Sequence, residues 1–169
     1  FRPFVYKKAN EFNLRGFVQN TGEGVKIIID DLEKTKQFLK NPPQISRVDD
    51  IAICEITLDE IKSKFPDANL NTFQIIQTDK YTLSNLTIPS DISICEKCRS
   101  ELFDKSNRRY GYFFISCTNC GPRYSIIQKT PFDRENTSLE KFHLCDECIW
   151  DYKDPLNRRY HAQTIACAN

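Results

Sequence analysis

Seven of the eight cysteines lie in the second half of the chain, at spacings that suit a metal ion. They fall into two sets, Cys95, Cys98, Cys117 and Cys120, and then Cys145, Cys148 and Cys167. Zn2+ takes four thiolates in a tetrahedron, and two CxxC pairs joined by a short hairpin supply them. A disulfide framework is the alternative, but no secretory signal accompanies the cysteines. The first set is therefore predicted to bind zinc.

The two cysteine-rich segments are copies of one another. Residues 95–119 and 145–169 are identical at 10 of 25 positions when they are aligned at an offset of fifty residues. A module of this size has too little core to fold unaided, so metal must supply much of its stability, roughly 10–16 kcal/mol for zinc in small peptides. Four thiolates leave no coordination position for water, which predicts a structural rather than a catalytic zinc.

The second copy contains three of the four cysteines. The counterpart of Cys120 falls on the position after Asn169, so we expect a cysteine there in the parent protein and an incomplete second site in this chain. Water or His161 would then be the fourth ligand. His161 and His143 are interpreted in the first place as hydrogen-bonding structural residues.

An Arg-Arg-Tyr sequence occurs in both copies, at 108–110 and at 158–160. One interpretation is a nucleic-acid contact. The preferred one is that the tyrosine packs under the metal while the arginines pair with nearby acids such as Asp104 and Asp154. The net charge is +1, with 24 basic and 23 acidic residues, whereas a domain that binds a phosphate backbone usually has a clear basic excess.

The first half has the pattern of a small α+β domain. Apolar spacing predicts a helix over 2–12 and a second helix, with an acidic start, over 31–40. Alternating segments on either side of glycines at 22 and 24 predict a β-hairpin over 14–30. The stretches 45–56 and 72–78 are predicted as strands, with Cys54 as a small buried hydrophobe. One further strand in front would complete a ferredoxin-like βαββαβ sandwich.

The chain contains no apolar stretch long enough for a membrane span, so we expect a soluble, cytoplasmic protein. It begins at Phe1 and contains no methionine, which we interpret as a piece of a longer protein.

Specific strings in both halves resemble known modules. "FRPFVY" followed by "LRGFVQNTGEGV" is similar to the acylphosphatase signature. "IPSDISICEKC", "NRRYGYFFISCTNCGPRYSI", "PFDRENT" and "NRRYHAQTIAC" resemble the two zinc-finger modules of the hydrogenase-maturation carbamoyltransferases, the HypF family. The resemblance implies an acylphosphatase-like domain over 1–79 that lacks its first strand, a linker over 80–90, and zinc-finger modules over 91–130 and 131–169.

The resemblance also implies a reaction scheme. Arg2 would hold the phosphoryl group of carbamoyl phosphate and Asn20 would orient the attacking water. The carbamate would pass to larger ATP-using domains that are absent here. The carbamoyl group would then reach a C-terminal cysteine of a HypE-family partner and become the cyanide ligand of a nickel–iron hydrogenase. The zinc modules would act as spacers, and the chain by itself is expected to retain little or no activity.

Two other classes stay open. A nucleic-acid-binding zinc-ribbon protein would show salt-sensitive binding, which the near-neutral charge argues against. A purely structural or docking segment would fold around zinc and hydrolyse nothing.

The unequal ligand sets predict unequal metal retention. Four thiolates surround the ion more completely than three, so the first cysteine set should keep zinc longer than the second when a chelator is added. Zinc release timed with a chromogenic chelator measures this. Equal retention of zinc by both sets would mean that His161 is a true ligand, or that the missing counterpart of Cys120 is not the fourth ligand.

Overall fold

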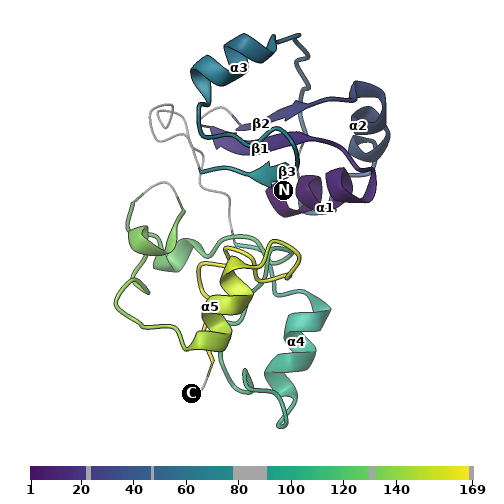
Figure 1. Cartoon of the computed structure of the whole chain (residues 1–169). Coiled ribbons are helices and arrows are strands. Elements are labelled where there is room, and N and C mark those ends of the chain that lie inside the picture. The colour runs from purple at the N-terminus through teal and green to yellow at the C-terminus, as the bar shows by residue number, and fades with distance from the viewer. Residues whose placement is uncertain (22–23, 47, 78–90, 130–131, 168–169) are drawn as a thin grey trace. The chain divides into compact units, whose positions relative to one another are not determined.

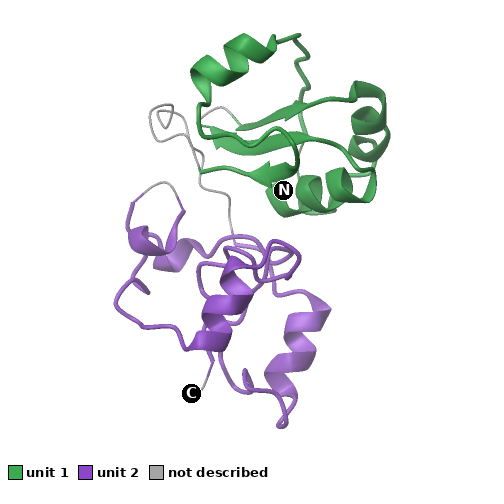
Figure 2. Cartoon of the chain, viewed as in Figure 1, with its two compact units in different colours: residues 1–82 green, residues 83–169 purple. Residues whose placement is uncertain are grey.

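The computed structural model describes residues 1–21, 24–46, 48–77, 91–129 and 132–167. The chain divides into two compact units, Phe1–Thr82 and Leu83–Asn169 (Figure 2). The boundary falls within the predicted linker, which lies outside the described residues. No helix in the described part of the chain is both long and apolar enough to cross a membrane.

The first unit is built on a three-stranded sheet in the order β2-β1-β3 (Figure 1). β1 (Gly16–Thr21) and β2 (Gly24–Ile29) pair antiparallel, as the predicted hairpin requires. β3 (Phe73–Ile75) pairs with β1 in parallel and lies within the predicted strand at 72–78. The turn between β1 and β2 lies outside the described residues.

Two predicted helices, α1 (Arg2–Glu11) and α2 (Leu32–Leu39), pack on this sheet. Asp31 caps α2, because its carboxylate accepts a hydrogen bond from the backbone N–H of Lys34 at 3.0 Å. The buried side chains of these helices meet those of the strands. The resulting core consists of Val5, Ala9, Leu14, Val18, Phe38 and Phe73.

The other face of the sheet is contacted at Phe17 by the end of a short helix that the sequence pattern did not predict. Neighbouring strand residues point to opposite faces, so Phe17 points away from the core that contains Val18. Its ring packs against Phe65, with 4.8 Å between the centroids, at the end of α3 (Leu58–Lys64). A capping box between Thr57 and Glu60 begins α3, and this sequence signal was visible.

The predicted strand at 45–56 is wrong. Its described residues are irregular, and Ile51 and Ile53 are exposed to 51% and 54%. Alternating β-branched residues form a strand only when they pair with a neighbouring strand, and the described residues of this segment pair with none of the three strands. Cys54, predicted as buried, is exposed for the same reason.

The second unit has little regular structure. Its helices α4 (Glu96–Phe103) and α5 (Asp146–Lys153) have eight residues each, and the 3-10 turns η2 (Tyr124–Ile126) and η3 (Arg134–Asn136) lie between them. One of its buried clusters consists of Cys98, Ile115, Cys117 and Cys120. Sulfur atoms thus form much of this small core.

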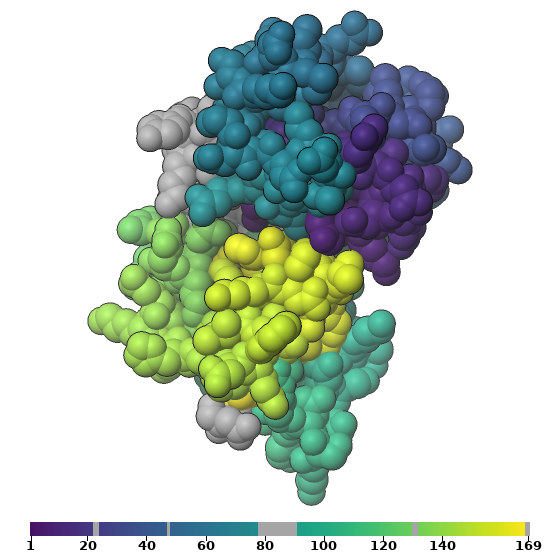
Figure 3. Space-filling view, in the orientation of Figure 1, coloured from purple at the N-terminus to yellow at the C-terminus, as the bar shows by residue number. Residues whose placement is uncertain are grey.

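The sequence repeat is also a structural repeat, and the two copies lie against one another (Figure 3). The backbone N–H of Gly111 donates to the Leu102 oxygen at 2.9 Å, and that of His161 donates to the Tyr152 oxygen at 3.0 Å. Gly111 and His161 both have positive φ, 71° and 51°. Positive φ is uncommon outside glycine, so the turn itself dictates the conformation of His161.

A substitution at Gly16 tests the close approach of β1 to β2. A Cβ at this residue, whose φ is +133°, would lie 2.0 Å from the backbone oxygen of Ile28. Gly16→Ala should lower the free energy of unfolding of the first unit by at least about 2 kcal/mol, because backbone strain and overpacking each cost about 1–3 kcal/mol. Hydrogen exchange of the β1 and β2 amides measures this.

Gly24→Ala is the matched control. Gly24 has φ +145°, but a Cβ there meets no atom within 4 Å, so only the strain remains. Its cost should be clearly smaller than that of Gly16→Ala. Equal costs would contradict the steric role of the Ile28 carbonyl.

Candidate metal centres and phosphate site

The first cysteine group brings together four sulfur atoms from two pieces of chain. Cys95 is the N-cap of α4, Cys98 lies in its first turn, and a loop adds Cys117 and Cys120. The Sγ of Cys117 lies 3.7 Å from those of Cys95 and Cys120, and all four lie within 4.8 Å of one another. A ZnS4 tetrahedron with Zn–S bonds of about 2.3 Å separates its sulfurs by about 3.8 Å. The group therefore fits zinc, and its sulfurs are too far apart for a disulfide.

Backbone N–H groups point at these sulfurs. The N–H of Cys95 donates to the Sγ of Cys120 at 3.2 Å, and that of Asn119 donates to the Sγ of Cys117 at 3.4 Å. Hydrogen bonds to sulfur favour the thiolate, which is the form that binds metal. The structure thus brings together all four residues predicted for the first site.

The second cysteine group contains Cys145, Cys148 and Cys167, with their Sγ atoms within 4.8 Å of one another. The Sγ atoms of Cys145 and Cys167 are 3.4 Å apart. His161 is not a member of this group. Its ring packs against Tyr152 and Tyr160, with centroid distances of 4.8 and 4.4 Å. Among the described residues the second group therefore offers three thiolates, and its fourth ligand stays open.

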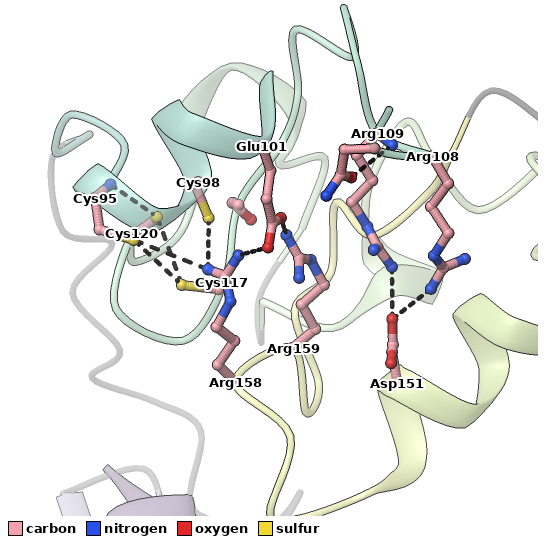
Figure 4. Close-up of polar contacts among 12 residues, drawn as sticks. Cys95, Cys98, Glu101, Arg108, Arg109, Cys117, Cys120, Asp151, Arg158 and Arg159 are labelled. Atoms are coloured by element: carbon pink, nitrogen blue, oxygen red, sulfur yellow. Dashed lines mark hydrogen bonds and ion pairs between the residues drawn. The ribbon is translucent and has the colours of Figure 1, made fainter. Parts of the chain in front are cut away.

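The arginines of the second copy reach the first copy (Figure 4). Arg158 forms an ion pair with Glu101 on α4 at 2.5 Å, and Arg159 binds the same carboxylate. The Nη1 of Arg158 also lies 3.0 Å from the Sγ of Cys98, a metal-ligand candidate of the first copy.

The arginines of the first copy contact the second copy in the same way. Arg108 and Arg109 of the first copy pair with Asp151 on α5, at 2.5 and 2.6 Å. The Nη1 of Arg108 lies 3.2 Å from the Sγ of Cys148 and forms a further ion pair with Glu147 at 3.1 Å. Each cysteine group is thus contacted by an arginine of the other copy.

These contacts correct the predicted partners of the arginines. Asp104 and Asp154 instead stabilise turns, because their carboxylates accept hydrogen bonds from the backbone N–H groups of Ser106 and Leu156, each at 2.9 Å. Tyr110 is 46% exposed, so the prediction that it packs beneath the metal is also wrong.

Glu101 and Asp151 are functional residues that the sequence analysis missed. Burial alone would raise their pKa values, but hydrogen bonds and charges from the paired arginines lower both pKa values below the ordinary range. Both carboxylates are therefore ionised at neutral pH. The two residues occupy equivalent positions at the offset of fifty residues, but they are a Glu and an Asp, so they do not count as an identity. An alignment that scores charge as well as identity would have found this pair of acids.

The predicted phosphate-binding residues lie on two elements of the first unit. Arg2 is the first residue of α1, and Asn20 lies near the end of β1 opposite Val25. Both are partly buried. A pocket of about 300 Å3, lined in part by Asn10 and Arg15, includes neither of them. Their joint role in catalysis stays a prediction.

Two family comparisons match separate parts of the chain. Residues 1–66 match the acylphosphatase family, and residues 94–127 and 144–169 match the HypF finger. The second match covers both cysteine groups, and the first covers α1, the hairpin, α2 and α3.

Two carbamoyltransferases are similar to most or all of the chain. A probable carbamoyltransferase HypF of Methanocaldococcus jannaschii is 46% identical over 144 residues, which are 80% of this chain and 18% of the relative. The carbamoyltransferase HypF of Rhodobacter capsulatus is 38% identical over 169 residues, covering 99% of this chain and 22% of the relative.

Solved structures agree with these matches. A crystal structure of full-length HypF in a phosphate- and nucleotide-bound form superimposes with a TM-score of 0.80 at 38% identity, over 99% of this chain and 22% of that one. HypF of T. kodakarensis superimposes with a TM-score of 0.73 at 42% identity, over 99% of this chain and 20% of that one. The chain thus spans about one fifth of the length of its relatives. With its acylphosphatase-like unit followed by two HypF fingers, the chain belongs to the HypF family.

Proposed function

We propose that this chain is the part of a carbamoyltransferase that cleaves carbamoyl phosphate and positions the product for transfer. The observation that carries the proposal is the match to HypF over 99% of the chain, with both modules in the same order. Outside this chain, ATP-using domains would adenylate the carbamate. The carbamoyl group would then go to the C-terminal cysteine of a HypE-family partner in nickel–iron hydrogenase maturation, in the cytoplasm.

The chemistry assigned to the first unit is hydrolysis of an acyl phosphate. The oxygen of a water attacks phosphorus, the bond from phosphorus to the acyl oxygen breaks, and carbamate leaves while the phosphate takes the proton. Arg2 suits the phosphate because a guanidinium binds two oxygens at once. Its place in the first turn of α1 adds the partial positive charge of a helix N-terminus. Asn20 would orient the water through its side-chain amide, so the residues act by positioning and charge stabilisation.

We assign one structural zinc ion to each cysteine group. The sulfur separations and the N–H groups that point at sulfur support this assignment. The four thiolates of the first group would fill the shell of their ion and leave no site for water, so that zinc would take no part in the hydrolysis. Cysteines 95, 98, 117 and 120 would hold one ion, and 145, 148 and 167 the other.

The nucleic-acid alternative finds little support at the repeated arginines. Arg109 and Arg159 are only 5% exposed and face carboxylates rather than solvent. A docking segment without activity is distinguished by the kinetic experiment below.

Substitutions of the two proposed site residues should have different kinetic effects in the native full-length protein. Asn20→Ala should lower kcat for carbamoyl phosphate hydrolysis by about 100-fold and change KM little, because the amide orients water rather than binding phosphate. Arg2→Ala should lower kcat and raise KM, because it removes a charge-assisted contact to the phosphate.

Lys7→Ala is the control for the loss of a cation from α1. Lys7 is exposed on the same helix, so its removal should leave both kinetic constants nearly unchanged. Small and equal effects of Arg2→Ala, Asn20→Ala and Lys7→Ala would contradict the assigned site and favour a docking role.

A cysteine substitution tests the zinc assignment separately. Cys98→Ser in this chain should remove about one zinc ion, because a buried thiolate ligand is lost. The first unit has its own core, so the β1 and β2 amides should keep their protection from hydrogen exchange. Native mass spectrometry measures the zinc, and Cys54→Ser, which lies outside both groups, should retain the full amount. Loss of protection in β1 would show that the two units do not fold independently.

A further inference from the structure

The contacts between the two finger modules are reciprocal at the cysteines. Arg158 lies 3.0 Å from the sulfur of Cys98, and Arg108 lies 3.2 Å from the sulfur of Cys148. Longer contacts of 4.0 and 3.8 Å reach Cys95 and Cys145. Each arginine therefore points at the first CxxC pair of the copy to which it does not belong.

The charge of a filled site explains why such an arginine matters. Four thiolates around Zn2+ carry a net charge of −2, and three carry −1. A buried anion is costly unless it is paired, and Cys98 and Cys148 are fully buried. A guanidinium N–H that donates to the sulfur offsets this charge without competing for the metal.

A carboxylate of the receiving module holds each arginine in place. Glu101 on α4 binds Arg158, and Asp151 on α5 binds Arg108, each at 2.5 Å (Figure 4). The backbone is fixed as well, because the Arg158 carbonyl accepts hydrogen bonds from the N–H of Thr118 at 2.8 Å and from its hydroxyl at 3.1 Å. Thr118 lies between the two cysteines of the second pair of the first group.

We propose that the two zinc sites form a coupled pair, in which Arg158 and Arg108 each stabilise the metal of the opposite module. The inference rests on the zinc assignment made above. Folding of one module places the arginine that the other module needs. Metal loss at one site therefore weakens the other, although the two sites share no ligand.

Differential alkylation of the folded chain tests the crossed effect. Cysteines that lose zinc react with N-ethylmaleimide, and peptide mass spectrometry identifies them. Arg158→Gln should speed labelling of Cys95, Cys98, Cys117 and Cys120 by at least about 10-fold, the lower end of the effect expected for a contact outside the ligand set. The second group should change less. Arg108→Gln should give the reverse pattern.

Three matched variants separate thiolate stabilisation from general effects. Arg159→Gln removes an arginine that binds the same Glu101 from the same module, and it should have a smaller effect on the first group. Arg99→Gln removes an exposed positive charge beside Cys98 and should have almost none. Arg158→Lys keeps the charge and should partly restore retention. In Co2+-substituted protein, Arg158→Gln should shift the sulfur-to-cobalt charge-transfer band of the first site.

The coupling itself has a separate measurement. Cys148→Ser changes no ligand of the first group, yet it should speed labelling of that group by at least about 10-fold, because the second module no longer holds Arg158 in place.

Three results would overturn the inference. Each arginine variant could release metal first from its own module, or Arg158→Gln could speed labelling no more than Arg159→Gln. Cys148→Ser could also leave the labelling rate of the first group unchanged. A wild-type chain that retains no zinc by native mass spectrometry would instead overturn the zinc assignment. Retained zinc with uncoupled sites would leave that assignment standing.

Discussion

The fold of the second unit depends on keeping buried cysteine sulfurs close together. Cys98, Cys120 and Cys148 have no exposed surface, and the modules around them are too short to bury a large apolar core. In the proposed sites zinc would balance the charge of the sulfurs in part, and a guanidinium from the neighbouring module would balance more of what remains. Each module is therefore completed by the other, which gives a physical reason why the repeat occurs as a pair within one compact unit.

The first unit shows how far local sequence patterns predict structure. Helices α1 and α2, the hairpin and β3 follow from apolar spacing, caps and glycines, which act within a few residues. The segment at 45–56 carries a strand pattern as well, yet it is irregular because a strand also needs a neighbour. Helix α3 has only seven residues, two of them apolar, so apolar spacing does not indicate it, and only the capping box at Thr57 marks its start.

In the sites too, contacts between residues close in sequence could be predicted, and contacts between distant residues could not. Spacing alone predicted the cysteine groups, since ligand pairs two residues apart must lie close together. The offset of fifty residues predicted that the two copies are equivalent, and their backbone hydrogen bonds are equivalent. It could not show whether Arg158 meets an acid of its own copy or of the other, because both arrangements preserve the repeat. Only the packing of the copies decides between Asp154 and Glu101.

The crossed contacts between the two copies also explain why both have arginine at the equivalent positions 108 and 158. In Arg158, Nη1 faces the Cys98 sulfur while Nη2 faces the Glu101 carboxylate. Arg108 divides its two nitrogens between Cys148 and Asp151 in the same way. A planar guanidinium can serve two anions along fixed directions, whereas the ammonium of lysine is a single point charge on a flexible stem. The carboxylate then fixes the direction in which the guanidinium meets the sulfur. Thiolate, guanidinium and carboxylate act as one unit, and each of these units needs residues from both modules.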